Sequence, residues 1–366
     1  MNENTQHNAP ISVSTAADLL AYVPAVLGFQ PRESLVIVTM RGKTAGMTLR
    51  NDAPAEGVRP VDYARTIMGY LLADTAADGV LLFVYTNEVA DAALSGENKD
   101  AKPYMDYAKA IETELERAGW VLRNGWLVTD KGYTTYFCEE SGCCTLNPLE
   151  EVHDSTVNAE LVYRGYSTRP SVEAMAVDPA FIGSRDAHAT IIQATYWINR
   201  LGAPDDLEFD HQKMRDARAE WNEALGEDVD ETAACELVSY LHIKSIRDRL
   251  MADAISAADD EPTFGKILTG QYEGRPDWSR VDATEDLLIK VLAYTPVEDR
   301  APLFCFLGWL CWYRGSSSVA IAYFTKAVDV DGQHRLSRLL REMVGRSYIA
   351  VPARSEATAY PQGRRH

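Results

Sequence analysis

The first half of the chain alternates between stretches with helical spacing and stretches rich in β-branched residues. A helix is predicted over residues 16–27, because Thr15 and Asp18 fit a capping box and Gly28 suits the position that ends a helix. The same periodicity predicts helices over 60–76 and 103–118. Runs of β-branched and aromatic residues predict strands over 34–40, 45–51, 79–85, 120–128 and 132–138.

The run at 79–85 is almost entirely apolar, which is typical of a central strand covered on both faces. Strands joined by helices indicate βαβ units. We therefore predict an N-terminal α/β domain over residues 12–180, with a mixed sheet and helices. The strand order does not follow from the pattern.

Beyond about residue 180 the strand-like runs nearly vanish and helical periodicity dominates. Helices are predicted over 187–201, 209–225, 231–257, 284–294 and 301–314. This pattern predicts an all-α helical domain over residues 181–351. The polar ends, residues 1–11 and 352–366, are predicted to be disordered tails.

Residues 301–334 match the spacing of a tetratricopeptide (TPR) unit. Phe304, Gly308, Ala320 and Phe324 take its aromatic and small positions, although Cys311 stands where tyrosine is usual and Gly332 where proline is usual. Small residues allow two antiparallel helices to approach closely. A single repeat cannot bury its own faces, so two interpretations stay open: a hairpin that caps a helical bundle, or part of a binding groove of stacked repeats.

The formal net charge of −18 argues against general binding to nucleic acid and against docking on anionic lipid. No apolar run approaches the ~18 residues that a membrane span requires. The first ten residues lack the charged-then-apolar pattern of a signal peptide. We therefore expect a cytoplasmic protein, whose six cysteines are free thiols or ligands rather than structural disulfides.

The sequence contains no dinucleotide-binding glycine motif, no phosphate-binding loop, no nucleophile elbow and no His-Glu-x-x-His motif. This weakens the interpretation as an enzyme, and no cofactor is predicted.

One candidate for ligand binding is the end of the second strand. Arg50 and Asp52 project to the same side, and the loop between Phe29 and Ser34 is expected to approach the same edge. An arginine there can grip a carboxylate or a phosphate of a small-molecule ligand while the aspartate orients it. The alternative is a structural salt bridge that closes the hairpin onto the neighbouring loop.

The densest group of reactive residues is formed by Cys138, Cys143 and Cys144, with His153 further along the chain. These residues allow a redox pair between Cys138 and Cys143, a zinc site that also uses His153, or thiols that only pack a turn. The spacing does not match the Cys-x-x-Cys knuckle of common zinc sites.

Several short blocks resemble an actinobacterial family of unknown function, domain of unknown function 4192. The resemblance rests on Asp18-Leu19-Leu20-Ala21, Leu27-Gly28-Phe29, Arg50-x-Asp52-x-Pro54, the Cys143-Cys144 pair, and Trp309 and Trp312 followed by Gly315. It covers about residues 12 to 350 and departs at Thr145, where proline is expected. The resemblance implies a fold and a phylum but no activity.

We rank three hypotheses for the function. The first is a non-enzymatic interaction or regulatory protein, in which the α/β domain senses a ligand and the helical domain docks a protein partner through Phe304, Trp309, Trp312 and Phe324, unless these aromatic residues form core. The second is an enzyme or binding protein for a small anionic ligand at the sheet edge. The third is a thiol redox or zinc protein.

Overall fold

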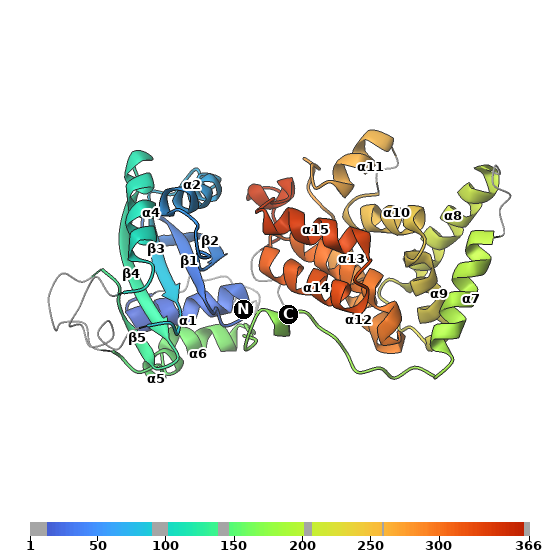
Figure 1. Ribbon diagram of the computed structural model, residues 1–366, viewed down its shortest axis with the longest axis horizontal. Helices are drawn as coiled ribbons and strands as arrows, with labels where there is room; N and C mark the ends of the chain where they lie inside the picture. Colours follow the sequence, from blue (N-terminus) through green and yellow to red (C-terminus); the bar gives the residue numbers. More distant parts are fainter. Residues whose placement is uncertain (1–12, 90–101, 138–145, 201–206, 258–259, 362–366) are drawn as a thin grey trace, which may run out of the picture. The chain divides into compact units, whose positions relative to one another are not determined.

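A five-stranded mixed sheet organises the N-terminal part of the computed structural model, which describes residues 13–89, 102–137, 146–200, 207–257 and 260–361 (Figure 1). The strand order is β2-β1-β3-β4-β5. The β3 and β4 strands run parallel, whereas the other neighbours are antiparallel. The bounds are β1 Ser34–Arg41, β2 Thr44–Asp52, β3 Gly79–Tyr85, β4 Val121–Thr129 and β5 Gly132–Thr135. The predicted mixed α/β fold is confirmed.

Helices cover both faces of this sheet (Figure 1). On one face α2 (Pro60–Leu71) and α4 (Met105–Arg117) pack against Leu35, Leu82 and Leu127. On the other face α1 (Ala16–Leu27) packs against Val36, Phe83 and Trp126. The short helices α5 (Glu150–His153) and α6 (Thr156–Tyr163) lie against α1. Because β3 is buried on both faces, its sequence is apolar throughout.

The second unit spans Glu173–Pro361 and is all-helical, as predicted. The predicted helix over 231–257 is two helices, because the chain turns at His242 and Ile243. Its elements are η3 (Glu173–Met175), α7 (Ala187–Arg200), α8 (Leu207–Ala224), α9 (Glu231–Leu241), α10 (Lys244–Ile255), α11 (Glu261–Leu268), α12 (Trp278–Tyr294), η4 (Val297–Asp299), α13 (Ala301–Tyr313), α14 (Ser317–Val330), α15 (Arg335–Gly345) and η5 (Val351–Arg354).

The prediction of a disordered tail from Pro352 onward is wrong for residues 352–361. Pro352 is buried, and the Trp278 indole donates a hydrogen bond to the carbonyl of Thr358 over 3.1 Å. Tyr360 donates to Asp282, and its ring lies under the Arg314 guanidinium. These contacts fasten the segment to α12 and to the end of α13. Its polar composition gave no indication of them in the sequence.

The α13 and α14 helices form the hairpin that was predicted over 301–334, with Gly315 at the turn in a left-handed conformation (φ 80°). Gly308 lies against the second helix: a Cβ added there would be 2.6 Å from Phe324 and 3.0 Å from the carbonyl oxygen of Ala320. The close approach expected of small residues is therefore present. Its assignment to the TPR class stays a prediction.

Substituting Gly308 with alanine should destabilise the helical unit, because the new methyl group has no room beside Phe324. We expect a loss of about 1–3 kcal/mol in the free energy of unfolding, measured by urea denaturation. Gly265 in α11 is the matched control, since a Cβ there meets nothing within 4 Å. Gly265→Ala should instead stabilise by about 0.5–1 kcal/mol. Equal effects of the two substitutions would contradict the packing argument.

Candidate functional site

The ligand-binding candidates at the sheet edge are engaged with one another. Arg50 Nη1 lies 2.6 Å from Asp52 Oδ1, and its Nη2 donates to the carbonyl of Arg32 over 3.4 Å. The Arg50 side chain is only 11% exposed, whereas Asp52 projects into solvent. The pair thus ties the end of β2 to the loop before β1. An anionic ligand that bound Arg50 would compete with these contacts.

Phe29 and Ser34 are both buried. The backbone on both sides of Phe29 is bonded to Arg169. The N–H of Gln30 donates to the Arg169 carbonyl, and the N–H of Arg169 donates to the Gly28 carbonyl, each over 2.9 Å. Ser34 lies in β1 between its partners Asp52 and Tyr85. Both residues therefore belong to the interior beneath the edge rather than to its solvent-facing side.

Glu33, which sequence reasoning missed, organises the same edge. Its backbone is left-handed (φ 36°), and its carboxylate accepts hydrogen bonds from Thr86 Oγ1 (2.6 Å) and from the backbone N–H of Asn87 (2.9 Å). The pKa of Tyr104, at the start of α4, is raised mainly by partial burial. The negative charge of the nearby Glu33 raises it further. These contacts join the ends of β1 and β3 across residues more than 50 positions apart, so spacing along the chain gave no signal of them.

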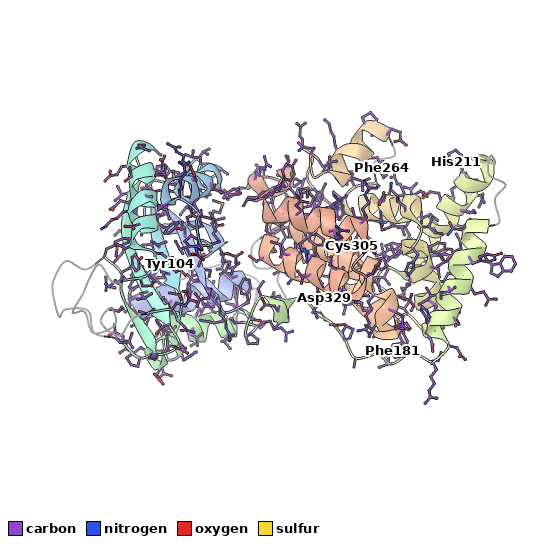
Figure 2. All side chains as sticks on the ribbon, in the orientation of Figure 1. Tyr104, Phe181, His211, Phe264, Cys305 and Asp329 are labelled. Carbon is purple, nitrogen blue, oxygen red and sulfur yellow. The ribbon has the colours of Figure 1, made fainter. Side chains whose placement is uncertain are left out.

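Cys138, Cys143 and Cys144 lie outside the described residues. His153, the alternative fourth zinc ligand, is exposed at the end of α5. Within the described ranges no three His, Cys, Asp or Glu side chains are grouped so as to hold a metal ion. Cys235, Cys305 and Cys311 are buried thiols, and burial raises the pKa of Cys305 (Figure 2) to about 11. A thiol with so high a pKa is a poor nucleophile at neutral pH.

The four aromatic docking candidates are buried. Phe304, Trp309 and Trp312 lie in α13, and Phe324 lies in α14, each with almost no exposed surface. A protein partner could reach them only by displacing neighbouring helices. Burial thus supports the core interpretation, and any docking surface of this unit has to be sought on its outer helices.

The described residues closest to an acid–base constellation meet at the start of α13. Asp299 is nearly buried, and its Oδ2 lies 2.7 Å from Nδ1 of His188 on α7. Its Oδ1 lies 3.8 Å from Nε2 of His242, just beyond α9. The hydrogen bond to Asp299 raises the pKa of His188, whereas burial lowers the pKa of His242.

A buried carboxylate that orients an imidazole is the arrangement of a general base. The nearby Cys235 thiol is a poor nucleophile for such a base, because burial raises its pKa. Its Sγ also faces the carbonyl of Ala187 at 3.9 Å. We therefore interpret Asp299 as a structural anchor that fastens α7 and α9 to the start of α13.

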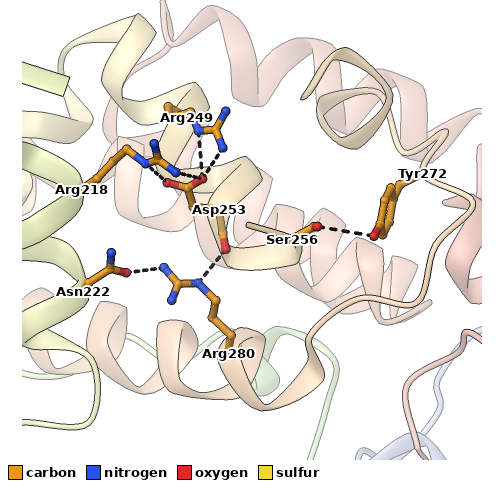
Figure 3. Close-up of polar contacts among 7 residues, drawn as sticks. All are labelled: Arg218, Asn222, Arg249, Asp253, Ser256, Tyr272 and Arg280. Carbon is orange, nitrogen blue, oxygen red and sulfur yellow. Dashed lines mark hydrogen bonds and ion pairs between the residues drawn. The ribbon is translucent and has the colours of Figure 1, made fainter. Parts of the chain in front are cut away.

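A second buried carboxylate, Asp253 in α10, is held by Arg218 of α8 and by Arg249 of its own helix (Figure 3). Arg218 of α8 donates to it over 2.6 and 3.2 Å, and Arg249 donates over 2.9 and 2.6 Å. Arg280 of α12 donates to the Asp253 carbonyl over 2.6 Å and also bonds Asn222. Because these guanidinium groups are engaged within the helical unit, the cluster clamps α8, α10 and α12 together.

The outer helix α7 carries large apolar side chains on its exposed side as well as on its buried side. Ala187 and Ile191 are buried and α7 packs against α9, while the opposite side exposes Ile192 (53%), Tyr196 (46%) and Trp197 (49%). The Tyr196 and Trp197 rings pack edge to face with their centroids 5.6 Å apart. Exposed apolar side chains that lie together in this way are typical of a surface that another molecule covers. Sequence reasoning could have found this signal, because apolar residues occupy adjacent positions at 191–192 and at 196–198.

The family model described as "Domain of unknown function (DUF4192)" matches residues 17–348, so the chain belongs to that family. No curated protein and no solved structure matches the chain. No helix among the described residues is both long and apolar enough to cross a membrane. Actinobacterial origin and a cytoplasmic location stay predictions.

The link between Asp299 and His188 predicts a pH dependence. Because Asp299 raises the folded-state pKa of His188, their ion pair contributes stability fully below the unfolded pKa of about 6.5. That stability is lost as the pH rises through the folded-state pKa. In an NMR titration we expect His188 to titrate above about 6.5 in the natural chain and lower in Asp299→Asn. Glu298→Gln, the neighbouring control, should shift the His188 pKa much less, and equal shifts would contradict this account.

Proposed function

We propose that this member of the DUF4192 family is a non-enzymatic interaction protein, and that the outer face of α7 is a protein-docking surface that receives a second copy of the chain. The exposed apolar face formed by Ile192, Tyr196 and Trp197 carries the proposal. Large exposed apolar groups that lie side by side are typical of interaction sites rather than of free surface. Ligand sensing by the α/β unit stays a prediction alongside it.

The near absence of charged residues on α7 makes this helix accessible to a second copy. Two chains of net charge −18 repel each other, and like charges facing across an interface are costly. Charged residues make up 25% of the chain, yet Arg200 is the only Asp, Glu, Lys or Arg among the 14 residues of α7. The α7 surface is therefore where two copies can approach with little direct repulsion.

The geometry of one helix suits a two-fold axis. An antiparallel pair of α7 helices would place the same face on both sides, as a two-fold interface requires, and would oppose the helix dipoles favourably. The helix is about 21 Å long at 1.5 Å per residue. A single pair of helices of this length buries less surface than the roughly 1,200–2,000 Å² of stable interfaces. We therefore expect a reversible dimer with a micromolar dissociation constant.

Sedimentation equilibrium between about 1 and 500 µM tests the proposal. The natural chain should shift from 40.6 kDa toward twice that mass as its concentration rises. Ile192→Glu and Trp197→Glu should stay monomeric, because each would bury an unpaired carboxylate in the interface. Unchanged circular dichroism and melting temperature would show that these surface variants still fold.

Leu339→Glu is the matched control, because Leu339 is equally exposed (52%) but lies on α15 of the same unit. It adds the same charge and should dimerise like the natural chain. A natural chain that stays monomeric throughout the concentration range would overturn the proposal. So would a dimer that survives both α7 substitutions.

A further inference from the structure

A segment near the C-terminal end of the helical unit carries a net positive charge, opposite in sign to that of the whole chain. Residues 332–354 contain five arginines, one glutamate and no aspartate or lysine, a formal net charge of +4 in a chain of net charge −18. Three of the arginines, Arg335, Arg338 and Arg341, follow one another at intervals of three residues on α15. Residues at this spacing neighbour one another on a helix. With Leu339 they define what we call the arginine face of α15.

These three guanidinium groups are not neutralised by the part of the chain that the structure describes, where they take part in no ion pair or side-chain hydrogen bond. Other arginines of the same unit do: Arg300 lies 2.5 Å from Asp178, and Arg314 lies 2.7 Å from Asp282. Arg335 and Arg338 are exposed, and Arg341 is half-buried. Like charges at this spacing repel, so the face is electrostatically poised for an acidic group.

Neither Glu342 nor His334, the other titratable residues of α15 and its N-cap, cancels the charge of the arginine face. Glu342, the only acidic residue of α15, is paired with Arg346 at 2.6 Å. His334, the N-cap of α15, is half-buried, and this desolvation lowers its pKa to about 4 and keeps it neutral at pH 7. The arginine face therefore keeps a charge of three arginines around the half-exposed side chain of Leu339.

We propose that the arginine face of α15 binds an acidic polypeptide segment that carries an apolar side chain among its carboxylates. Arg335 and Arg341 are six residues apart, about 9 Å along the helix, which three residues of an extended strand or two turns of a helix can span. Carboxylates of the segment would pair with the guanidinium groups, and its apolar residue would cover Leu339. This surface lies on another helix than α7, and the inference does not depend on the proposed self-association.

A peptide fits this face better than a nucleic acid. The residues outside 332–354 carry a formal net charge of −22, because the whole chain carries −18 and this stretch +4. A duplex carries one phosphate per about 1.7 Å of its axis and would extend past the arginine face over an acidic molecule. A short acidic segment satisfies three arginines without that repulsion.

Fluorescence anisotropy with the full-length protein tests the inference. The probe is a labelled peptide of about 15 residues that repeats Glu-Glu-Leu, long enough to span the face as a helix of about 22 Å. The matched probe replaces every Glu with Gln. We expect the acidic probe to bind more tightly than the Gln probe, and its affinity to fall as salt is raised. Arg335→Gln with Arg338→Gln should weaken binding of the acidic probe about tenfold.

Two single substitutions separate this surface from general electrostatics. Arg185→Gln removes one positive charge from an exposed arginine elsewhere in the unit and should change the affinity by less than about twofold. Glu342→Gln should tighten binding about two- to threefold, because it removes the only acidic group of α15 and releases Arg346. A purely structural role of α15 predicts no such gain.

Several results would overturn the inference: equal binding of the Glu and Gln probes, no loss in the double arginine variant, or an equal loss in Arg185→Gln. Tighter binding of a labelled single-stranded oligothymidine of similar length, lost in the same double variant, would assign the face to nucleic acid instead. Ile192→Glu, which should abolish self-association, should leave binding of the acidic probe intact. The two proposals can therefore fail separately.

Discussion

One helix that is buried along its whole length determines how the helical unit is built. Every residue of α13, from Ala301 to Tyr313, is buried. Surrounding a helix of 13 residues on all sides takes several neighbours, and α9, α12, α14 and α15 contact it. The Trp312 indole donates to the carbonyl of Tyr348, and Tyr313 donates to the carbonyl of Ile267, so the polar atoms of these two aromatic residues are satisfied inside. The most aromatic stretch of the chain therefore lies in the core of the helical unit.

A fully buried helix also decides where charges can lie. The chain enters α13 through Asp299 and Arg300, two nearly buried ionic residues. Each is compensated within the unit: Asp299 by His188, and Arg300 by Asp178 and the carbonyl of Thr295. An unpaired buried charge would cost several kcal/mol, so pairing here is a condition of folding. Unpaired charge and uncovered apolar surface are tolerated only on the outer helices, which is where α7 and α15 carry them.

The sequence predicted the elements well because their signals are local. The apolar run at 79–85, the capping box at Thr15 and Asp18, and the glycine at the α13–α14 turn all act within a few residues. The candidate site depends on distant pairs instead. Asp299 and His188 are 111 positions apart, and Glu33 and Thr86 are 53 apart, so no spacing rule can bring them together. Periodicity also identified the aromatic residues of α13 without telling whether other helices cover them. Residues 352–361 were predicted to be a tail because their local composition does not show their contacts with distant helices.

The two outer helices show what composition leaves open once the core is known. In Figure 1 α7 and α15 lie on different sides of the helical unit, with α9, α12 and α13 among the helices between them. One face is apolar and almost free of formal charge, and the other is cationic in an acidic chain. Surfaces of such opposite chemistry on one helical unit do not compete for the same occupant. If two copies pair through α7, the pair presents two arginine faces, and an acidic partner with two matching segments would gain affinity through effective concentration without any new contact. Self-association and partner binding would then be coupled through geometry alone.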